Sequence, residues 1–440
     1  MRITNFEHTG LDKVEKWIDN NAVKHMDKET IKEALKVINV SFVAEDIDRI
    51  QSTLLCELKC SYVQQSQRYV TMSDDAHILP NLNDEDSKVA RELIKKAFDL
   101  YTRMSKLKEG DFKGRPKIEN YEHGIPIEDA RYILPLSTKT NLCIAMTGDK
   151  LYQLFLLIND EKYLSIFTEF KKQLLNLLPS NLIELLPNAY DGNKYKDLVE
   201  SLYLDDMDKI DSENNMVLLS SFKNIDLKVG LGALTSTQAR TPSETLELWK
   251  KDATKKARGV AERVLGYGHD SIAEQARTTF GMQCSMVTYH QQIRHRLSQN
   301  HREDFCNLII DIERPVVAPQ SIKDSMFYKE YLDLADSFKA FRMNILEKYG
   351  QDKAFSFLLN CDQIKLITST NARHDVQMLA ERTCINAQWE IRELATKKLM
   401  ILRRMSNILY EKALPSCVLG KCKEGKLSCG SQDVMRNRFL

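Results

Sequence analysis

The sequence predicts a mostly helical fold with short strands, built as two diverged copies of one unit, and two observations carry that prediction. Residues 86–110 and 323–350 each place apolar residues at helical spacing and close on a glycine, a common stop signal for a helix. The likeness continues beyond these glycines, where Ala130 and Ala354 begin short apolar helices at equivalent positions. A repeated order of elements indicates an internal duplication.

The repeats set the predicted domain organisation. We predict an N-terminal repeat at 1–203, an acidic linker at 204–215, a C-terminal repeat at 216–412 and a cysteine- and glycine-rich tail at 413–440. The linker, "LDDMDKIDSENN", is predicted from its acidic residues and its shortage of apolar ones. The chain of 440 residues is long enough for two cores, since one core usually stops growing at about 250–300 residues.

Charge and hydropathy exclude several classes of partner. The 63 basic and 62 acidic residues leave a net charge of +1, so no overall field attracts nucleic acid or an anionic membrane. Apolar runs such as 151–158 are far shorter than the ~20 residues that span a bilayer, and the N-terminus shows no signal-peptide core. We expect a cytoplasmic protein with no membrane and no nucleic-acid partner, in which any anion site is local.

The segment "QQIRHRLS" (291–298) concentrates cationic side chains. On a helix, Gln291, Arg294 and Ser298 would share one face, because residues three and four apart are neighbours. His295 and Arg296 would point elsewhere, so one short segment could contact two ligands. From spacing alone, a solvated basic helix end is the favoured interpretation, since cations there gain ~0.3–1 kcal/mol from the helix dipole.

Three motifs in order change that balance. "GHDSIAE" (268–274), "QQIRHRLS" and "NARHDVQMLAERTCINAQWEIRELA" (371–395) resemble flavin-dependent thymidylate synthases, whose signature is Arg-His-Arg-x-x-Ser-x-x-x-x-Ser-x-Arg. The resemblance spans most of 216–410. It implies an α+β fold with short antiparallel sheets, here as two diverged copies of the family fold forming an intrachain pseudo-dimer. Because family members are usually homotetramers, it also implies a homodimer of two-repeat chains.

The second copy keeps only half of the signature. After Arg294-His295-Arg296, Ser298 arrives one residue too early, and Glu303 and Phe305 stand near the expected serine and arginine. A carboxylate there would repel a phosphate. The end of the motif that holds phosphate is therefore missing from this copy.

The first copy supplies the missing half. "CELKCSYVQQSQRYV" (56–70) contains Ser61 and, after four residues, Ser66-Gln67-Arg68. Its own Arg-His-Arg has become Cys-Glu-Leu at 56–58. The two copies thus carry complementary halves of one signature.

The same exchange recurs downstream. Arg131 resembles a family arginine that helps bind the nucleotide, and the second copy has Phe355 at the equivalent place. Conversely, Arg382 matches the family's substrate-activating arginine, and its counterpart in the first copy is Ile158.

We therefore expect one composite active site for each pair of copies, with the symmetry-related site inactive. The resemblance implies conversion of dUMP to dTMP, with FAD as cofactor and with methylene-tetrahydrofolate and NADPH as co-substrates. Arg382 is the expected catalytic residue, because a guanidinium can stabilise charge that develops on the uracil carbonyl. The residues expected to bind dUMP are Gln65, Ser66, Arg68, Arg131, Gln291, Arg294 and Arg382. The residues expected to line FAD are Ser271, Arg294, His295, Arg296, Asn371, Arg373 and Gln377.

Other interpretations remain open at this level. The deletion after Arg296 brings His301 and Arg302 towards the reacting groups and is compatible with another one-carbon transfer, such as hydroxymethyl transfer to a pyrimidine nucleotide. A non-catalytic protein that binds dUMP or flavin would share the phosphate-binding residues without needing Arg382. A degenerate copy used only as scaffold is a third interpretation.

The tail raises a separate question. Cys417, Cys422 and Cys429 alternate with glycines, and three thiolates with a fourth ligand from elsewhere would suit zinc or an iron–sulfur cluster. The alternative is three reduced thiols, which is the normal state of cysteine in a reducing compartment. Cys56 and Cys60 are expected in the core, as free cysteines usually are.

Overall fold

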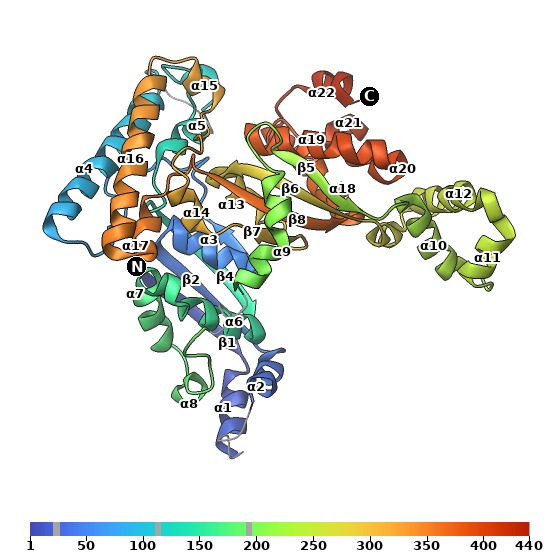
Figure 1. The fold of residues 1–440 in the computed structure, drawn as a ribbon, viewed down its shortest axis with the longest axis horizontal. Helices are drawn as coiled ribbons and strands as arrows, with labels where there is room; N and C mark the ends of the chain where they lie inside the picture. The colour runs from blue at the N-terminus through green and yellow to red at the C-terminus, as the bar shows by residue number, and fades with distance from the viewer. Residues whose placement is uncertain (21–26, 111–115, 191–195, 440) are drawn as a thin grey trace. The chain divides into compact units, whose positions relative to one another are not determined.

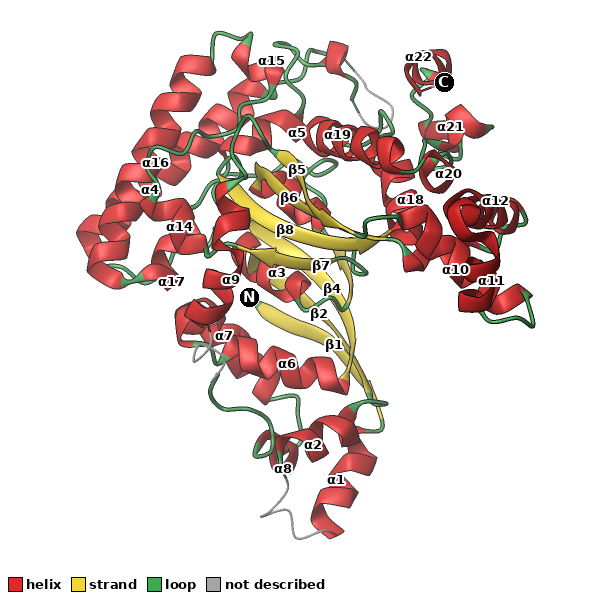
Figure 2. Ribbon diagram, turned by 45° about the vertical axis from the view of Figure 1, so that its right-hand side comes forward, coloured by secondary structure: helices red, strands yellow, loops and turns green. Residues whose placement is uncertain are grey.

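The structure, a computed structural model, is an α+β fold with two four-stranded sheets and describes residues 1–20, 27–110, 116–190 and 196–439 (Figures 1 and 2). The strand order is β1-β2-β4-β3 in one sheet and β5-β6-β8-β7 in the other. Both sheets therefore place their first, second, fourth and third strands in the same spatial order. This shared topology supports two copies of one unit.

The chain forms two compact units whose limits differ from those of the repeats. Unit 1 contains residues 1–199, 285–294 and 304–363, and unit 2 contains residues 200–284, 295–303 and 364–440. Unit 1 thus combines the first repeat with two stretches of the second. The repeat and linker boundaries themselves stay predictions.

The first sheet belongs to unit 1 and is antiparallel throughout. Its strands are β1 (Arg2–Thr9), β2 (Asn39–Asp48), β3 (Ser61–Gln64) and β4 (Lys139–Thr147). Burial alternates along β4, as it does in a strand with one face on a core. The register of β2 shifts near Asp46, whose φ of 52° marks a bulge.

Helices make up the rest of unit 1. They are α1 (Leu11–Asn20), α2 (Lys28–Leu35), α3 (Arg49–Glu57), α4 (Asp84–Met104), α5 (Ile127–Ala130), α6 (Gly148–Ile158), α7 (Leu164–Leu175), α8 (Ser180–Ile183), α13 (Met286–Gln292), α14 (Phe305–Ile310), α15 (Gln320–Lys323), α16 (Tyr328–Tyr349) and α17 (Gln351–Ala354). Short 3-10 turns, η3 (Arg131–Ile133) and η8 (Phe355–Phe357), follow α5 and α17. The equivalence predicted for these two short helices is thus present, although Ala130 and Ala354 end them.

The two long helices of unit 1, α4 and α16, lie side by side and antiparallel (Figure 1). Lys348 at the end of α16 pairs with Asp86 at the start of α4 at 3.2 Å, and Arg103 near the end of α4 donates to Glu330 at 3.1 Å. The expected stop at Gly350 is confirmed, because its φ of 92° takes the chain out of the helix.

The first long helix is shorter than its sequence suggested. It ends at Met104 rather than at Gly110. Ser105 caps the end, since its hydroxyl donates to the Tyr101 carbonyl oxygen at 2.7 Å. The chain then leaves the helix axis, and Leu107 forms a β-bridge with Tyr121.

Equivalent segments of the two repeats exchange hydrogen bonds within unit 1. The Leu136 N–H donates to the Leu358 carbonyl at 2.7 Å, and the Asn360 N–H donates to the Leu134 carbonyl at 2.9 Å. When Ala130 is matched with Ala354, Leu134 corresponds to Leu358 and Leu136 to Asn360. The two bonds are therefore reciprocal, which is the signature of a two-fold contact between like subunits.

Unit 2 holds the second sheet and its own core. The strands are β5 (Met216–Ser221), β6 (Arg277–Ser285), β7 (Gln299–Arg302) and β8 (Gln363–Asn371). The helices are α9 (Lys196–Asp208), which begins at the end of unit 1, α10 (Ile225–Thr237), α11 (Pro242–Trp249), α12 (Ala253–Gly266), α18 (Ala372–Arg382), α19 (Trp389–Met405), α20 (Asn407–Tyr410), α21 (Ser416–Leu419) and α22 (Gln432–Phe439). The core includes Phe280, Leu399 and, from the tail, Met435 and Phe439.

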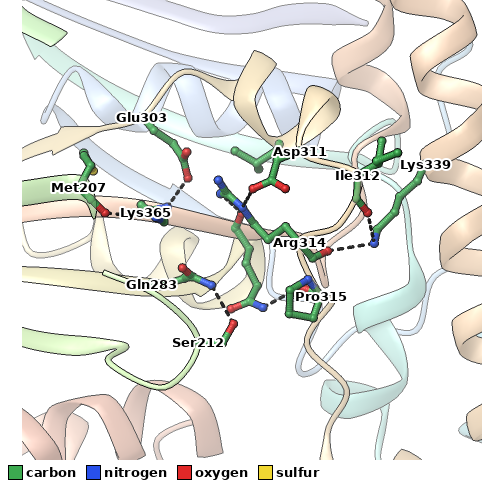
Figure 3. A network of polar contacts seen from close by, with 12 residues as sticks. Met207, Ser212, Gln283, Glu303, Asp311, Ile312, Arg314, Pro315, Lys339 and Lys365 are labelled. Atoms are coloured by element: carbon green, nitrogen blue, oxygen red, sulfur yellow. Dashed lines mark hydrogen bonds and ion pairs between the residues drawn. The ribbon is translucent and has the colours of Figure 1, made fainter. Parts of the chain in front are cut away.

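The segment predicted as a linker is packed against the second sheet. Residues 204–208 continue α9. Lys365 of β8 donates to the Met207 carbonyl at 3.1 Å, and Gln283 of β6 donates to the Ser212 hydroxyl at 3.2 Å (Figure 3). Among the helices in the described ranges, none is long and apolar enough to cross a membrane.

Candidate functional site

Arg68 is held beside Glu128 in unit 1, just after β3. The Arg68 Nε donates to Glu128 Oε2 at 2.8 Å, and the Arg68 N–H donates to Ser66 Oγ at 3.2 Å. Gln65 is fixed to β4, because its N–H donates to the Asn141 carbonyl at 2.9 Å. The serine and arginine half of the signature therefore forms a tight turn anchored to the first sheet.

Arg131 lies on η3 and is 6% exposed. Its Nε donates to the Glu128 carbonyl oxygen at 3.1 Å. Within the described chain, neither Arg131 Nη2 nor Nε2 of the buried Gln67 has a hydrogen-bond partner. Burial lowers the pKa of Arg131 to about 10. Buried donors without acceptors are rare, and each calls for a water or ligand.

The second repeat contributes α13 to the same unit. Gln291 is buried near the end of this helix, and Arg294 follows it. The Arg294 Nη2 donates to Gln64 Oε1 at 3.3 Å, and the Tyr62 hydroxyl donates to the Ile293 carbonyl at 2.8 Å. Because α13 ends at Gln292, the helical face expected for Gln291, Arg294 and Ser298 does not form.

Arg49 joins this group although nothing in the sequence marked it. It begins α3, is 6% exposed, and its Nη2 lies 2.7 Å from His290 Nδ1 on α13. Burial and the charges of Arg131 and Arg294 lower the pKa of Arg49 to about 9. Arg131 and Arg294 are thus close enough to Arg49 for their charges to act on it.

The region of unit 1 around Arg49, Arg68, Arg131 and Arg294 carries more positive than negative charge. Arg68 has the Glu128 carboxylate as a partner, whereas the described residues provide no ion pair for Arg49, Arg131 or Arg294. Guanidinium groups bind phosphate oxygens in a forked geometry. The arrangement is therefore suited to a phosphate-bearing ligand.

The predicted catalytic arginine lies in unit 2 and contacts a predicted flavin residue. The Arg382 Nε donates to His295 Nε2 at 2.9 Å. The His295 ring meets the His374 ring edge-on, with centroids 5.9 Å apart. Burial lowers the pKa of His374. Because a guanidinium only donates, His295 accepts this bond through an unprotonated Nε2.

Other predicted flavin residues gather around the start of α18. Asn371 caps the helix by accepting a bond from the His374 N–H at 2.9 Å. Arg373 forms an ion pair with Glu274 of the "GHDSIAE" segment. Arg373 and Gln377 line a cavity of about 240 Å³. Ser271 lies in the 3-10 turn η7 (Asp270–Gln275), and both it and Arg296 are exposed.

The residues after Arg296 have structural contacts. Glu303 accepts a hydrogen bond from the Lys365 N–H at 2.6 Å (Figure 3), and Phe305 is fully buried. His301 stacks on Tyr203 with ring centroids 4.4 Å apart. The sequence suggested that His301 approaches the reacting groups, whereas in the structure its ring packs against α9.

The metal site proposed for the tail is not supported. Throughout the described ranges, no group of three or more histidine, cysteine or acidic side chains is arranged to hold a metal ion. Cys417 is buried in the apolar core of unit 2, while Cys429 is exposed. Cys422 packs against the same core, and burial together with the charges of Cys422 and Cys429 raises the pKa of the Cys417 thiol, so these thiols lie near one another although they do not form such a group. Cys56 and Cys60 are buried, as expected.

Comparisons with known proteins give a consistent result. The family model described as thymidylate synthase complementing protein (Thy1) matches residues 4–165 and 218–406. A flavin-dependent thymidylate synthase from Pyrococcus abyssi is 32% identical over 176 residues, covering 38% of this chain and 72% of that protein. One from Thermococcus kodakarensis is 35% identical over 176 residues, with the same coverage. One from Geobacter sulfurreducens is 27% identical over 200 residues, covering 44% of this chain and 85% of that protein.

A solved structure is also similar. It is the crystal structure of the flavin-dependent thymidylate synthase ThyX from Helicobacter pylori complexed with FAD and dUMP, at 17% identity and a TM-score of 0.36, covering 46% of this chain and 99% of that one. The family model covers both repeats of the present chain, one in each matched stretch. The chain therefore belongs to the flavin-dependent thymidylate synthase family.

Proposed function

We propose that this protein converts dUMP to dTMP with FAD, methylene-tetrahydrofolate and NADPH, through one composite active site that uses residues of both repeats. The observation that carries the proposal is the cluster of guanidinium groups in unit 1. Arg68 and Arg131 come from the first repeat and Arg294 from the second, and buried donors beside them lack partners within the described residues.

The nucleotide phosphate would bind in that cluster. Arg68, oriented by Glu128, and Arg131 would each donate to phosphate oxygens, together with Ser66 and the backbone at Gln65. The spare Nη2 of Arg131 has no other acceptor among the residues described, so phosphate binding would satisfy it. Gln291 and Arg294 would contact the nucleoside from the second repeat.

Arg382 would stabilise the reaction at the base. Loss of the uracil N3 proton would place negative charge on the carbonyl oxygens and make C5 nucleophilic; C5 would then bond to the methylene carbon as the bond from that carbon to the folate nitrogen breaks, and the C5 proton would leave afterwards. A positioned guanidinium lowers the barrier of such a step. The bond from Arg382 Nε to His295 Nε2 fixes the guanidinium plane, so the remaining N–H groups keep one orientation.

The reaction needs no cysteine nucleophile from the protein, and this agrees with the state of the nearby thiol. Cys56 occupies the position in the first repeat that corresponds to Arg294. Burial raises the pKa of the Cys56 thiol well above its ordinary value, which keeps it protonated and unreactive.

FAD, when bound, supplies the hydride that completes the methyl group, and NADPH restores the reduced flavin. Arg373, Gln377 and the N-cap Asn371 offer the donors that flavin phosphates and ring edges require. The 240 Å³ cavity beside them is smaller than the ~300–1,000 Å³ of typical ligand pockets. It would therefore hold one portion of the dinucleotide, with Ser271, Arg294, His295 and Arg296 along the rest.

The equivalent region of the first repeat has different chemistry. A cavity of about 390 Å³ there is lined by Thr147, which corresponds to Asn371, and by Lys59 and Lys150. Asp149 stands where the second repeat has Arg373, and a carboxylate would repel flavin phosphates. This difference supports one flavin site in each chain.

Two measurements on the purified protein test the proposal. A visible absorption spectrum should show bound flavin, and the flavin bands should shift when dUMP is added. Protein supplied with methylene-tetrahydrofolate and NADPH should release tritium from dUMP labelled at C5 and yield dTMP by mass spectrometry. A hydroxymethylated product would redirect the proposal to another one-carbon transfer, and flavin binding without tritium release would make the protein a non-catalytic binder.

A further inference from the structure

Arg49 is placed firmly by the backbone around it. Its N–H donates to the carbonyl oxygens of Leu136 and Thr138, at 2.9 and 3.1 Å. Those carbonyls belong to the segment that follows Arg131, so the start of α3 is tied to the segment that carries one of the proposed phosphate ligands. The position of Arg49 is therefore not set by a mobile surface loop.

The side chain of Arg49 has only a neutral partner. Its Nη2 faces His290 Nδ1 at 2.7 Å, and the other ring nitrogen of His290 contacts the Thr53 hydroxyl. Burial, reinforced by the charges of Arg49 and Arg294, lowers the pKa of His290 well below its usual range. A neutral imidazole orients the guanidinium but leaves its charge uncompensated.

No carboxylate in the described part of unit 1 compensates that charge. Arg49 Nε has no hydrogen-bond partner there. The adjacent Asp48 caps α3 by accepting the Gln51 N–H at 2.7 Å, and burial raises its pKa to about 7. Leaving a buried charge unpaired costs several kcal/mol, so a buried arginine in this state is expected to have a ligand anion as its counterion.

Hydrogen bonds connect the helix that carries Arg49 to residues proposed to bind dUMP. Ser52, one turn after Arg49 on α3, accepts a bond from Gln64, and Gln64 accepts one from Arg294. The face of α3 that carries Arg49 thus turns towards the residues proposed to bind dUMP. When Cys56 is matched with Arg294, the counterpart of Arg49 in the second repeat is Val287, so this charge belongs to one copy only.

We propose that Arg49 is a further phosphate-binding residue, which acts with Arg131 and Arg68 on the phosphate of a nucleoside monophosphate. The proposal rests on the proposed function for the identity of the nucleotide. Its physical basis, a buried guanidinium oriented by His290 and lacking a counterion among the described residues, does not depend on that identity.

The test compares Arg49→Gln and Arg49→Met with the wild-type chain. We expect dUMP to bind roughly 10- to 100-fold more weakly by calorimetry, the usual effect of losing a charged hydrogen bond, while deoxyuridine, which lacks the phosphate, binds as before. The melting temperature without ligand should stay the same or rise, because an uncompensated buried charge has been removed. The stabilisation that inorganic phosphate or pyrophosphate gives the wild-type chain should fall.

Arg342→Met is the matched control. Arg342 is also fully buried in unit 1, but it pairs with Asp362, so its loss should lower the melting temperature. If Arg49→Gln behaves like this control, or binds dUMP as tightly as wild type, the proposal is overturned. If the wild-type protein does not bind dUMP, but inorganic phosphate raises its melting temperature and raises that of Arg49→Gln less, the proposed function fails and the anion site stands. If the wild-type protein neither binds dUMP nor is stabilised by inorganic phosphate or pyrophosphate, both the proposed function and the anion site fail.

Discussion

Arg294 donates a hydrogen bond from Nη2 to Oε1 of Gln64 at 3.3 Å, across 230 residues of sequence. Gln64 ends β3, two residues before Ser66 of the signature half kept by the first repeat, and Arg294 opens the half kept by the second. The contact holds Arg294 of the second repeat in the same compact unit as Ser66 and Arg68 of the first, whereas His295 and Arg296 belong to unit 2. A nucleotide site built from both repeats requires such a contact.

Loss of either first-repeat guanidinium should weaken dUMP binding. For Arg68→Gln and Arg131→Gln we expect a loss of about 1.5–3 kcal/mol, the value of a hydrogen bond to a charged group. Calorimetric titration with dUMP and with deoxyuridine measures the effect, and only dUMP should bind more weakly.

Arg103→Gln provides the control for charge alone. Its side chain is 42% exposed and pairs with Glu330 on the surface of unit 1, so dUMP affinity should not change. Equal weakening by Arg103→Gln and Arg68→Gln would mean that the arginines act through overall charge rather than through contact.

Arg382→Gln should reduce tritium release more than it reduces nucleotide binding. Removal of one donor that stabilises developing charge lowers kcat by roughly 100- to 1,000-fold. His295→Phe should have a smaller effect in the same direction, because it removes the acceptor that holds Arg382 Nε. Arg404, exposed near the end of α19, gives a matched Arg404→Gln control, and an Arg382→Gln enzyme as fast as that control would contradict the assigned role.

Asp48 should make stability depend on pH. Burial raises its pKa in the folded chain from about 3.8 to about 7, so between these values the folded state keeps a proton that the unfolded state releases. The free energy of unfolding therefore falls as pH rises through this window, by up to about 1.4 kcal/mol per pH unit. Asp48→Asn keeps a capping oxygen but cannot titrate. In urea unfolding, the free energy of unfolding of the variant should therefore rise relative to that of wild type from pH 4 to pH 7. A difference between the two chains that is constant with pH would refute this.

Metal removal should leave the tail intact. Met435 and Phe439 pack into the core of unit 2, so apolar burial holds the tail in place. Treatment with a chelator should not change the melting temperature, whereas Phe439→Ala should lower it. The free energy of unfolding should fall by up to ~3–5 kcal/mol, the cost of removing a phenylalanine side chain from a typical core. Stoichiometric zinc or an iron–sulfur absorption band in the purified protein would show that the cysteines bind metal after all.

Local signals in the sequence predicted the parts of the fold that depend on them. The end of α16 was predictable because Gly350 adopts a φ of 92°, which most residues avoid. The end of α4 was not, because it depends on the Ser105 hydroxyl and on a bridge between Leu107 and Tyr121. The duplication was predictable from the repeated order of elements, and both sheets show it.

Long-range contacts limited the prediction of the candidate site. From the sequence alone, Arg49 is a lone arginine at a helix start, a position that is usually solvated. Its burial depends on α13, where its partner His290 lies 241 residues away. Conversely, the sequence predicts that the Glu303 carboxylate repels a phosphate, whereas in the structure this carboxylate accepts a hydrogen bond from the Lys365 N–H. Side chains with such distant partners cannot be assigned from spacing.

The stoichiometry of dUMP binding tests the composite site most directly. Calorimetry on the wild-type chain should give one dUMP per 440-residue chain. Arg68→Gln in the first repeat and Arg294→Gln in the second should each weaken that same single site. Two sites per chain, or a dUMP affinity that one of these substitutions leaves unchanged, would contradict the account.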